Sequence, residues 1–134
     1  GGPFAALIVK DGKIIAQGTN LVTSLNDPTA HAEMVAIRKA CRVLGSFRLE
    51  GCQIYTTCEP CPMCMGAIYW ARPARVYFAN LGEEAATFGF DDSFILGQLR
   101  LPIGRRTIPM TQMMWKEARQ AFREWERKPD KKPY

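Results

Sequence analysis

Four residues of this chain have the types and the spacing of a metal centre with an acid–base group beside it. Glu33 follows His31 by two positions, and Cys61 and Cys64 form a Cys-x-x-Cys pair further along the chain. A catalytic zinc takes three protein ligands through nitrogen, sulfur or oxygen and keeps its fourth, tetrahedral position open for water. The residue types therefore predict one zinc ion held by His31, Cys61 and Cys64, with Glu33 moving protons beside the open position.

The spacing of His31 and Glu33 sets a condition on the helix that carries them. Positions i and i+2 of a regular helix point in nearly opposite directions. Both side chains can face one metal only if the first turn of the helix abuts the site, which Pro28 just upstream permits. Cys61 and Cys64 can aim both sulfurs at one point from the first turn of a second helix, where unpaired N–H groups favour thiolates.

Other uses of these residues stay open from their types alone. A closed structural zinc site could take Cys58 as its fourth ligand, although Glu33 and Glu59 would then have no role. An iron–sulfur cluster is disfavoured because Ile68 stands where the ferredoxin pattern has its fourth cysteine. If the zinc is structural, the chain would be a non-catalytic, zinc-stabilised binding module, which is the alternative to an enzyme.

The elements that must carry these residues alternate between strands and helices. Apolar and β-branched runs predict strands at 4–10, 13–17, 53–57 and 75–79, with a hairpin turn at Asp11-Gly12. Helical spacing predicts helices at about 30–44, 63–71 and 81–88, and an amphipathic helix from 111 to before Pro129. Residues 18–28 are predicted as a loop, and 91–109 show no clear pattern. This order predicts an α/β fold, a three-layer α/β/α sandwich with a central mixed sheet.

Size and composition fit one domain over residues 1–134 that works in the cytoplasm. The chain is 47% hydrophobic and 23% charged, and it has no apolar run of membrane-spanning length. No secretory signal is present, so a metal is a better use of the five cysteines than disulfides. Much of the net charge of +5 alternates with acidic residues late in the chain, as on a solvated helix, so nucleic acid is not the expected partner.

The metal motif resembles that of the zinc nucleobase deaminases, in the cytidine deaminase-like superfamily. Their signature is His-x-Glu followed by Pro-Cys-x-x-Cys, and it is present as His31-Ala32-Glu33 and Pro60-Cys61-Pro62-Met63-Cys64. Within the superfamily the chain resembles the bacterial guanine deaminases over nearly its whole length. The segments that carry this second resemblance are 2–4, Asn20, 24–31, 58–64, 66–73, 89–94 and 131–134.

The resemblance implies a reaction and a set of site residues. The reaction would be hydrolysis of guanine to xanthine and ammonia, with one zinc per chain and with Glu33 and Asp92 as the catalytic groups. An amide such as Asn20 could donate to the ring carbonyl or N7, and Asp92 could accept from the departing amino group. Asn20 could instead be only a turn residue, and Asp91 remains an alternative to Asp92. The other residues that the resemblance assigns to the purine site are Phe4, Ala32, Trp70 and Tyr134.

Two related activities share these motifs, namely guanosine deamination and tRNA adenosine deamination. The resemblance also implies a homodimer and a helix ahead of the first strand, which we expect to be missing from the sequence. The C-terminal tail, 129–134, would close over a site, in exchange with the partner subunit. A frayed basic terminus is the simpler alternative for these six residues.

Overall fold

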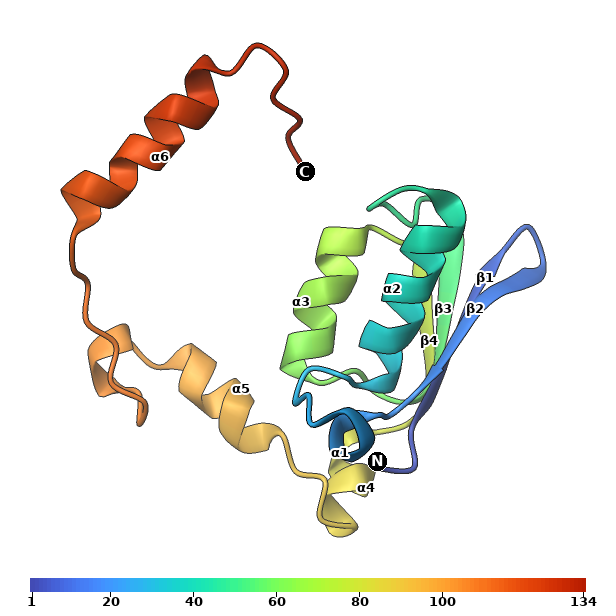
Figure 1. Ribbon diagram of the computed structural model, residues 1–134. Coiled ribbons are helices and arrows are strands. Elements are labelled where there is room, and N and C mark those ends of the chain that lie inside the picture. The colour runs from blue at the N-terminus through green and yellow to red at the C-terminus, as the bar shows by residue number, and fades with distance from the viewer. The chain divides into compact units, whose positions relative to one another are not determined.

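A four-stranded sheet organises residues 1–95 in the computed structural model of this protein, which describes residues 1–134. The strands are β1 (Ala5–Lys10), β2 (Lys13–Thr19), β3 (Cys52–Cys58) and β4 (Arg75–Asn80), in the spatial order β2-β1-β3-β4 (Figure 1). Strand β1 pairs antiparallel with β2 and β3, whereas β3 and β4 are parallel. The prediction of a mixed sheet is therefore confirmed.

The turn chemistry and the side-chain alternation of the strands explain this sheet. Asp11 and Gly12 join β1 to β2 with φ values of 50° and 73°, as a tight hairpin between twisted strands requires. Ile8 lies opposite Ile54 across the β1–β3 pair, and both are fully buried. Because successive residues of a strand point to opposite faces, Ala6 and Thr56 are buried on the same side.

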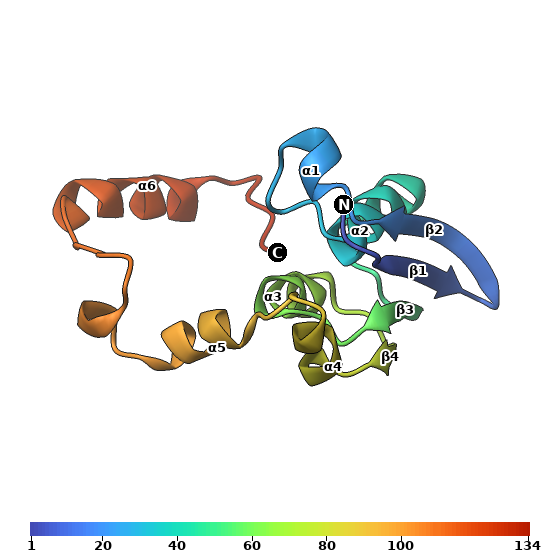
Figure 2. The same cartoon turned by 90° about the horizontal axis from the view of Figure 1, so that it is seen from below.

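Helices α2 (Ala32–Leu44) and α3 (Pro62–Ala71) pack side by side against one face of the sheet (Figures 1 and 2). Ala36 and Ala40 of α2 and Ile68 of α3 belong to the same buried core as the strands. The opposite face carries Tyr55 and Tyr77, whose stacked rings have centroids 4.7 Å apart and are partly exposed. Residues 1–95 therefore supply two of the three predicted layers.

The structure corrects the sequence prediction in three segments. The predicted loop 18–28 contains a one-turn helix, α1 (Val22–Leu25), which is too short to show a periodic pattern. The helix predicted from about residue 30 begins at Ala32. The segment without a clear pattern forms α5 (Ser93–Arg100) and a 3-10 turn at Ile103–Arg105, after α4 (Gly82–Thr87).

Residues 96–134 form a second compact unit. Its main element is α6 (Trp115–Arg127), which confirms the predicted amphipathic helix but begins four residues later than predicted, at 115 rather than 111. No residue of this unit is buried, and large apolar side chains such as Phe122 and Trp125 are exposed. Across the chain, every helix is too short or too polar to span a lipid bilayer.

Candidate active site

Three side chains with metal-binding atoms converge at the starts of α2 and α3. His31 Nδ1 lies 3.5 Å from Cys61 Sγ, and the ligand atoms of His31, Cys61 and Cys64 all lie within 4.8 Å of one another. Tetrahedral zinc, with bonds of about 2.0–2.3 Å, would separate these atoms by roughly 3.5–3.8 Å. One nitrogen and two sulfurs at this spacing fit a zinc ion.

The start of α2 removes the conflict in the spacing of His31 and Glu33. His31 is the N-cap of the helix, with φ −65° and ψ 156°, so it lies outside the regular helical turn. Glu33 is the second helical residue, and its side chain is only 8% exposed. The loop before the helix is fixed by Asp27, whose Oδ1 accepts hydrogen bonds from the Thr29 backbone N–H and hydroxyl. The first turn therefore faces the metal ligands, as predicted.

The start of α3 places the two cysteines in the same manner. Cys61 is the N-cap, Pro62 is the first helical residue, and Cys61 Sγ accepts a hydrogen bond from the Cys64 backbone N–H at 3.5 Å. A hydrogen bond from the Cys64 thiol, assisted by this N–H, lowers the pKa of Cys61 to about 6. The same shared hydrogen bond, burial and the Glu33 carboxylate raise the pKa of Cys64. The pair thus retains a proton that a divalent cation would displace on binding.

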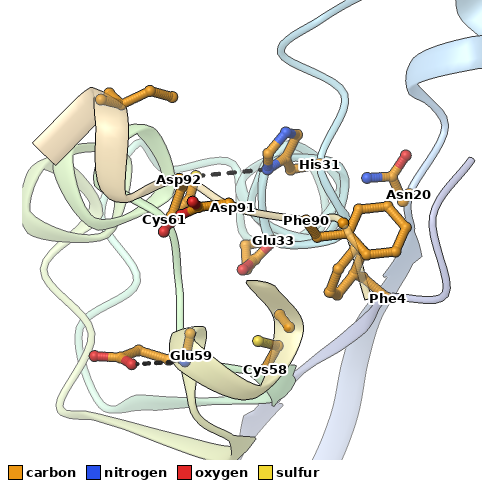
Figure 3. Close-up of a pocket in the computed structure, with 14 residues that line it drawn as sticks. Phe4, Asn20, His31, Glu33, Cys58, Glu59, Cys61, Phe90, Asp91 and Asp92 are labelled. Carbon is orange, nitrogen blue, oxygen red and sulfur yellow. Dashed lines mark hydrogen bonds between the residues drawn. The ribbon is translucent and has the colours of Figure 1, made fainter. Parts of the chain in front are cut away.

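Beside these ligands lies a cavity of about 290 Å³. This is close to the lower end of the range of ~300–1,000 Å³ typical of ligand sites, which suits a small molecule. Six of the predicted site residues line it, and the close-up in Figure 3 shows them around one space: Phe4, Asn20, His31, Glu33, Cys61 and Asp92. The sequence prediction gave no site role to several other lining residues, among them Glu59, Ala85, Phe90 and Ile95.

Asn20 presents its amide to the cavity in a fixed orientation. Its Oδ1 accepts a hydrogen bond from the Val22 backbone N–H at 3.1 Å, at the start of α1. Because that oxygen is engaged in the turn, the NH₂ group is the part of the amide that remains to bind a ligand. The turn role and the ligand role that the sequence left as alternatives are therefore compatible in one side chain.

Two neighbouring carboxylates, those of Asp91 and Asp92, line the cavity and differ in their hydrogen bonds. Asp91 is exposed, and its Oδ1 accepts a hydrogen bond from the Ser93 backbone N–H at 2.8 Å, in a turn that leads into α5. Hydrogen bonds from Ser93 also lower the pKa of Asp91. Asp92 is half-buried, and its carboxylate takes no part in this hydrogen bond. Asp92 is thus the carboxylate better placed to meet a ligand.

The cavity also has an apolar wall and a buried thiol. The rings of Phe4 and Phe90 meet edge to face, with centroids 5.0 Å apart. Cys58 is 8% exposed, and its Sγ donates to the Leu81 carbonyl oxygen at 3.8 Å. Burial is the main cause that raises the pKa of Cys58. Since Cys58 lies outside the group of metal-binding atoms, the arrangement corresponds to an open zinc site with three protein ligands.

Two predicted purine-site residues of the first unit are not on the cavity wall. Trp70 lies near the end of α3 and is 61% exposed. Ala32 is buried at the start of α2, between the two functional residues of the motif. Tyr134 belongs to the second unit. Phe90 does line the cavity, and it directly precedes Asp91-Asp92 in the sequence. A single apolar residue at that position does not indicate a ligand contact from sequence alone, so the prediction missed it.

Comparison with known proteins identifies relatives of the whole chain. Residues 1–80 match the family model of the cytidine and deoxycytidylate deaminase zinc-binding region. Guanine deaminase from Bacillus subtilis (strain 168) is 57% identical over 134 residues, which cover 100% of this chain and 86% of that protein. An X-ray structure of the Bacillus subtilis guanine deaminase matches with a TM-score of 0.98 over 100% of this chain and 85% of that one. The tRNA-specific adenosine deaminase of Aquifex aeolicus is 50% identical over 82 residues, 61% of this chain and 54% of its own.

Proposed function

The chain belongs to the cytidine and deoxycytidylate deaminase family of zinc-binding proteins, and from this premise we propose that it hydrolyses guanine to xanthine and ammonia. It is a zinc-dependent aminohydrolase whose substrate is a small purine base. The observation that carries the choice of guanine is the 57% identity to a guanine deaminase along the entire chain. The likeness to a tRNA adenosine deaminase covers only 61% of the chain.

The proposed mechanism assigns proton transfer to Glu33. When bound at His31, Cys61 and Cys64, zinc is a Lewis acid that lets water act as a nucleophile near neutral pH. Glu33 takes the proton from the attacking water and delivers it to the amino group that leaves C2 of guanine. Glu33 is buried beside the metal-binding residues, so its carboxylate is held at the reacting position, which supports this role. A positioned acid–base group accelerates a reaction by about 10²–10⁴-fold.

The proposed recognition of guanine uses groups from three segments. The Asn20 amide donates to the ring carbonyl or N7, and the Asp92 carboxylate accepts from the amino group or a ring N–H. Where Asn20 donates to the carbonyl, adenine is disfavoured, because it has an amino group at that carbon and would set a donor against the Asn20 donor. Phe4 and Phe90 form the apolar wall against the flat ring. A site that needs such polar matching discriminates by roughly 10⁴-fold or more against a ligand that lacks the matching group.

We further propose a homodimer in which residues 96–134 are exchanged between subunits. The support is the second unit itself, which has no buried residue and leaves Phe122 and Trp125 of α6 exposed. An amphipathic helix is stabilised mainly by burying its apolar face. One deaminase domain over residues 1–134 would then be completed by the partner subunit, with the tail 129–134 and Tyr134 over the partner's site. Mixing Glu33→Gln with a variant truncated after Pro129 tests this, because only exchange restores activity in the mixture.

A cytoplasmic location completes the proposal. All five cysteines are free thiols, and the pair at the metal site must stay reduced to bind zinc. Fractionation of the source cells with an antibody against the protein would test the location.

Ammonia release tests the proposed function directly. Guanine, guanosine, adenine, cytosine and an adenosine-bearing RNA hairpin are compared as substrates, and zinc content is measured on the same sample. We expect about one zinc per chain and fast release from guanine alone. Ammonia release from guanosine or from the hairpin would identify that compound, and not guanine, as the substrate. Bound zinc without ammonia release from any compound would favour a binding module.

A further inference from the structure

Two loops beside the metal site are held together by hydrogen bonds. One follows β3 and leads to Cys61, and the other follows β4 and leads to α4. The Glu59 backbone N–H donates to the Asn80 carbonyl oxygen at 2.8 Å, and the Asn80 side-chain amide donates to the Thr57 carbonyl oxygen at 2.8 Å. These contacts arise because β3 and β4 are parallel, so their carboxyl ends meet at one edge of the sheet.

A carboxylate adds the contact that reaches α4. Glu59 Oε2 accepts a hydrogen bond from the Gly82 backbone N–H at 3.0 Å, drawn as a dashed line in Figure 3. Gly82 is the first residue of α4, where backbone N–H groups have no partner within the helix. A hydrogen bond to a charged acceptor is about twice as strong as one between neutral groups. Glu59 thus ties the first turn of α4 to the loop that carries a metal ligand.

The anchored helix leads directly into one wall of the cavity. Ala85 of α4 lines the cavity, and its carbonyl oxygen accepts a hydrogen bond from the Phe90 backbone N–H at 3.1 Å. Phe90 packs against Phe4, and Asp92 follows two residues later. A shift of α4 would therefore move Phe90 and Asp92 relative to Cys61.

We propose that Glu59 is a positioning residue for deamination, whose carboxylate fixes α4 and thereby the placement of Phe90 and Asp92 against the metal site. This inference rests on the proposed function. Glu59 is neither a metal ligand nor the proton carrier in this account. It lies outside the group of metal-binding atoms, and one of its oxygens is committed to Gly82.

Three variants isolate this contact. Glu59→Ala removes the acceptor, whereas Glu59→Gln keeps an oxygen that can accept from Gly82 without the charge. Gly82→Pro removes the N–H donor without changing residue 59, and because its Cδ atom takes the place of the hydrogen, the Glu59 carboxylate must withdraw from α4. Proline suits this position, because it is the first of a helix and Leu81 before it has φ −74° and ψ 155°, in the region that a residue preceding proline favours.

Steady-state kinetics on guanine and zinc content are measured for each variant. Since a misplacement of about 1 Å can lower a rate by about 100-fold, we expect kcat/KM to fall about 10- to 100-fold in Glu59→Ala and Gly82→Pro, with zinc retained. Glu59→Gln should stay within about threefold of wild type, because the hydrogen bond is kept in weaker form. The Glu59→Ala effect should shrink in an Asp92→Asn background, since both changes act through the same wall.

Several results would overturn the proposal. Equal losses in Glu59→Gln and Glu59→Ala would assign a role to the charge itself, and loss of zinc in Glu59→Ala would assign a role in metal retention. Full activity in Gly82→Pro would show that the contact has no effect on the wall. If Glu59→Ala does not fold, Gly82→Pro decides the question from the other side of the contact.

Hydrogen exchange separates this inference from the proposed function. The backbone N–H groups of residues 82–92 should exchange faster in Glu59→Ala than in wild type, whatever the substrate is. Inactivity of the wild type on guanine would refute the substrate and leave this comparison intact. Unchanged exchange together with an active wild type would refute the positioning role alone.

Discussion

The substitution Gly18→Ala should lower activity, although Gly18 is neither a metal-binding residue nor part of the cavity wall. Gly18 lies in β2, where the sheet meets the start of α2. A Cβ atom at this position would lie 2.4 Å from the Ala32 carbonyl oxygen and 2.8 Å from the Ala36 backbone nitrogen. Both atoms are backbone, so no side chain can rotate away to make room. The first turn of α2, which carries His31 and Glu33, must move instead.

The size of the movement follows from the contact distance. An ordinary contact needs at least 3.4 Å, so the turn must withdraw by about 3.4 − 2.4 = 1.0 Å. Overpacking of this kind destabilises a protein by about 1–3 kcal/mol, which for a domain of this size lowers Tm by roughly 3–15 °C. A displacement of about 1 Å at a catalytic group can also lower a rate by about 100-fold. We therefore expect kcat/KM on guanine to fall about 100-fold.

Gly66→Ala is the matched control. Gly66 is exposed on α3, and a Cβ atom there would meet no atom within 4 Å. Alanine is favoured over glycine inside a helix by about 0.5–1 kcal/mol, so this variant should be slightly more stable and fully active. Ammonia release at saturating zinc and thermal unfolding are measured for both variants. If Gly18→Ala retained wild-type activity and Tm, the close approach of β2 to α2 would not be what positions Glu33.

Three further predictions concern single side chains. Glu33→Gln should lower kcat by about 10²–10⁴-fold with zinc still bound, as metal analysis of the inactive variant would show; unchanged turnover would favour a binding module. Asn20→Asp keeps the oxygen that accepts from Val22 but loses the amide donors, so KM for guanine should rise about 10- to 100-fold without a change in Tm. Hydrogen bonds from Thr29 lower the pKa of Asp27, so the stability that wild type gains over Asp27→Asn should be present above the ordinary value of 3.8 and lost as the pH falls through the lower folded pKa. Unfolding curves at pH 7 and at pH values below the ordinary one would measure that loss.

The sequence was most informative where residue type and local backbone geometry decide the structure. Hairpin chemistry at Asp11-Gly12 and alternation along the strands predicted the sheet, and ligand chemistry predicted the three metal-binding residues. The spacing of His31 and Glu33 also predicted that the first turn of a helix faces the metal. The structure has this arrangement because the helix begins at Ala32 and leaves His31 as its cap.

The sequence was least informative where contacts join distant segments. Glu59 meets Gly82 only because β3 and β4 are parallel neighbours, and no local pattern specifies that pairing. Phe90 lines the cavity because a short helix ahead of it ends at the cavity wall. A one-turn element such as α1 has no periodicity to detect, although its start orients Asn20. The choice between Asp91 and Asp92 likewise depends on which carboxylate accepts the hydrogen bond from Ser93.

The active site is placed by the starts of two helices more than by the conformations of long side chains. His31 and Cys61 are both N-caps with extended backbone, and each projects its ligand atom from outside its helix. The unpaired N–H groups at the N-terminal ends of helices favour anions, and the Cys64 N–H contributes to the lowered pKa of Cys61. Because backbone geometry fixes the ligands, any contact that holds a helix start acts on the chemistry. This explains why a glycine in β2 should influence proton transfer without reaching the substrate.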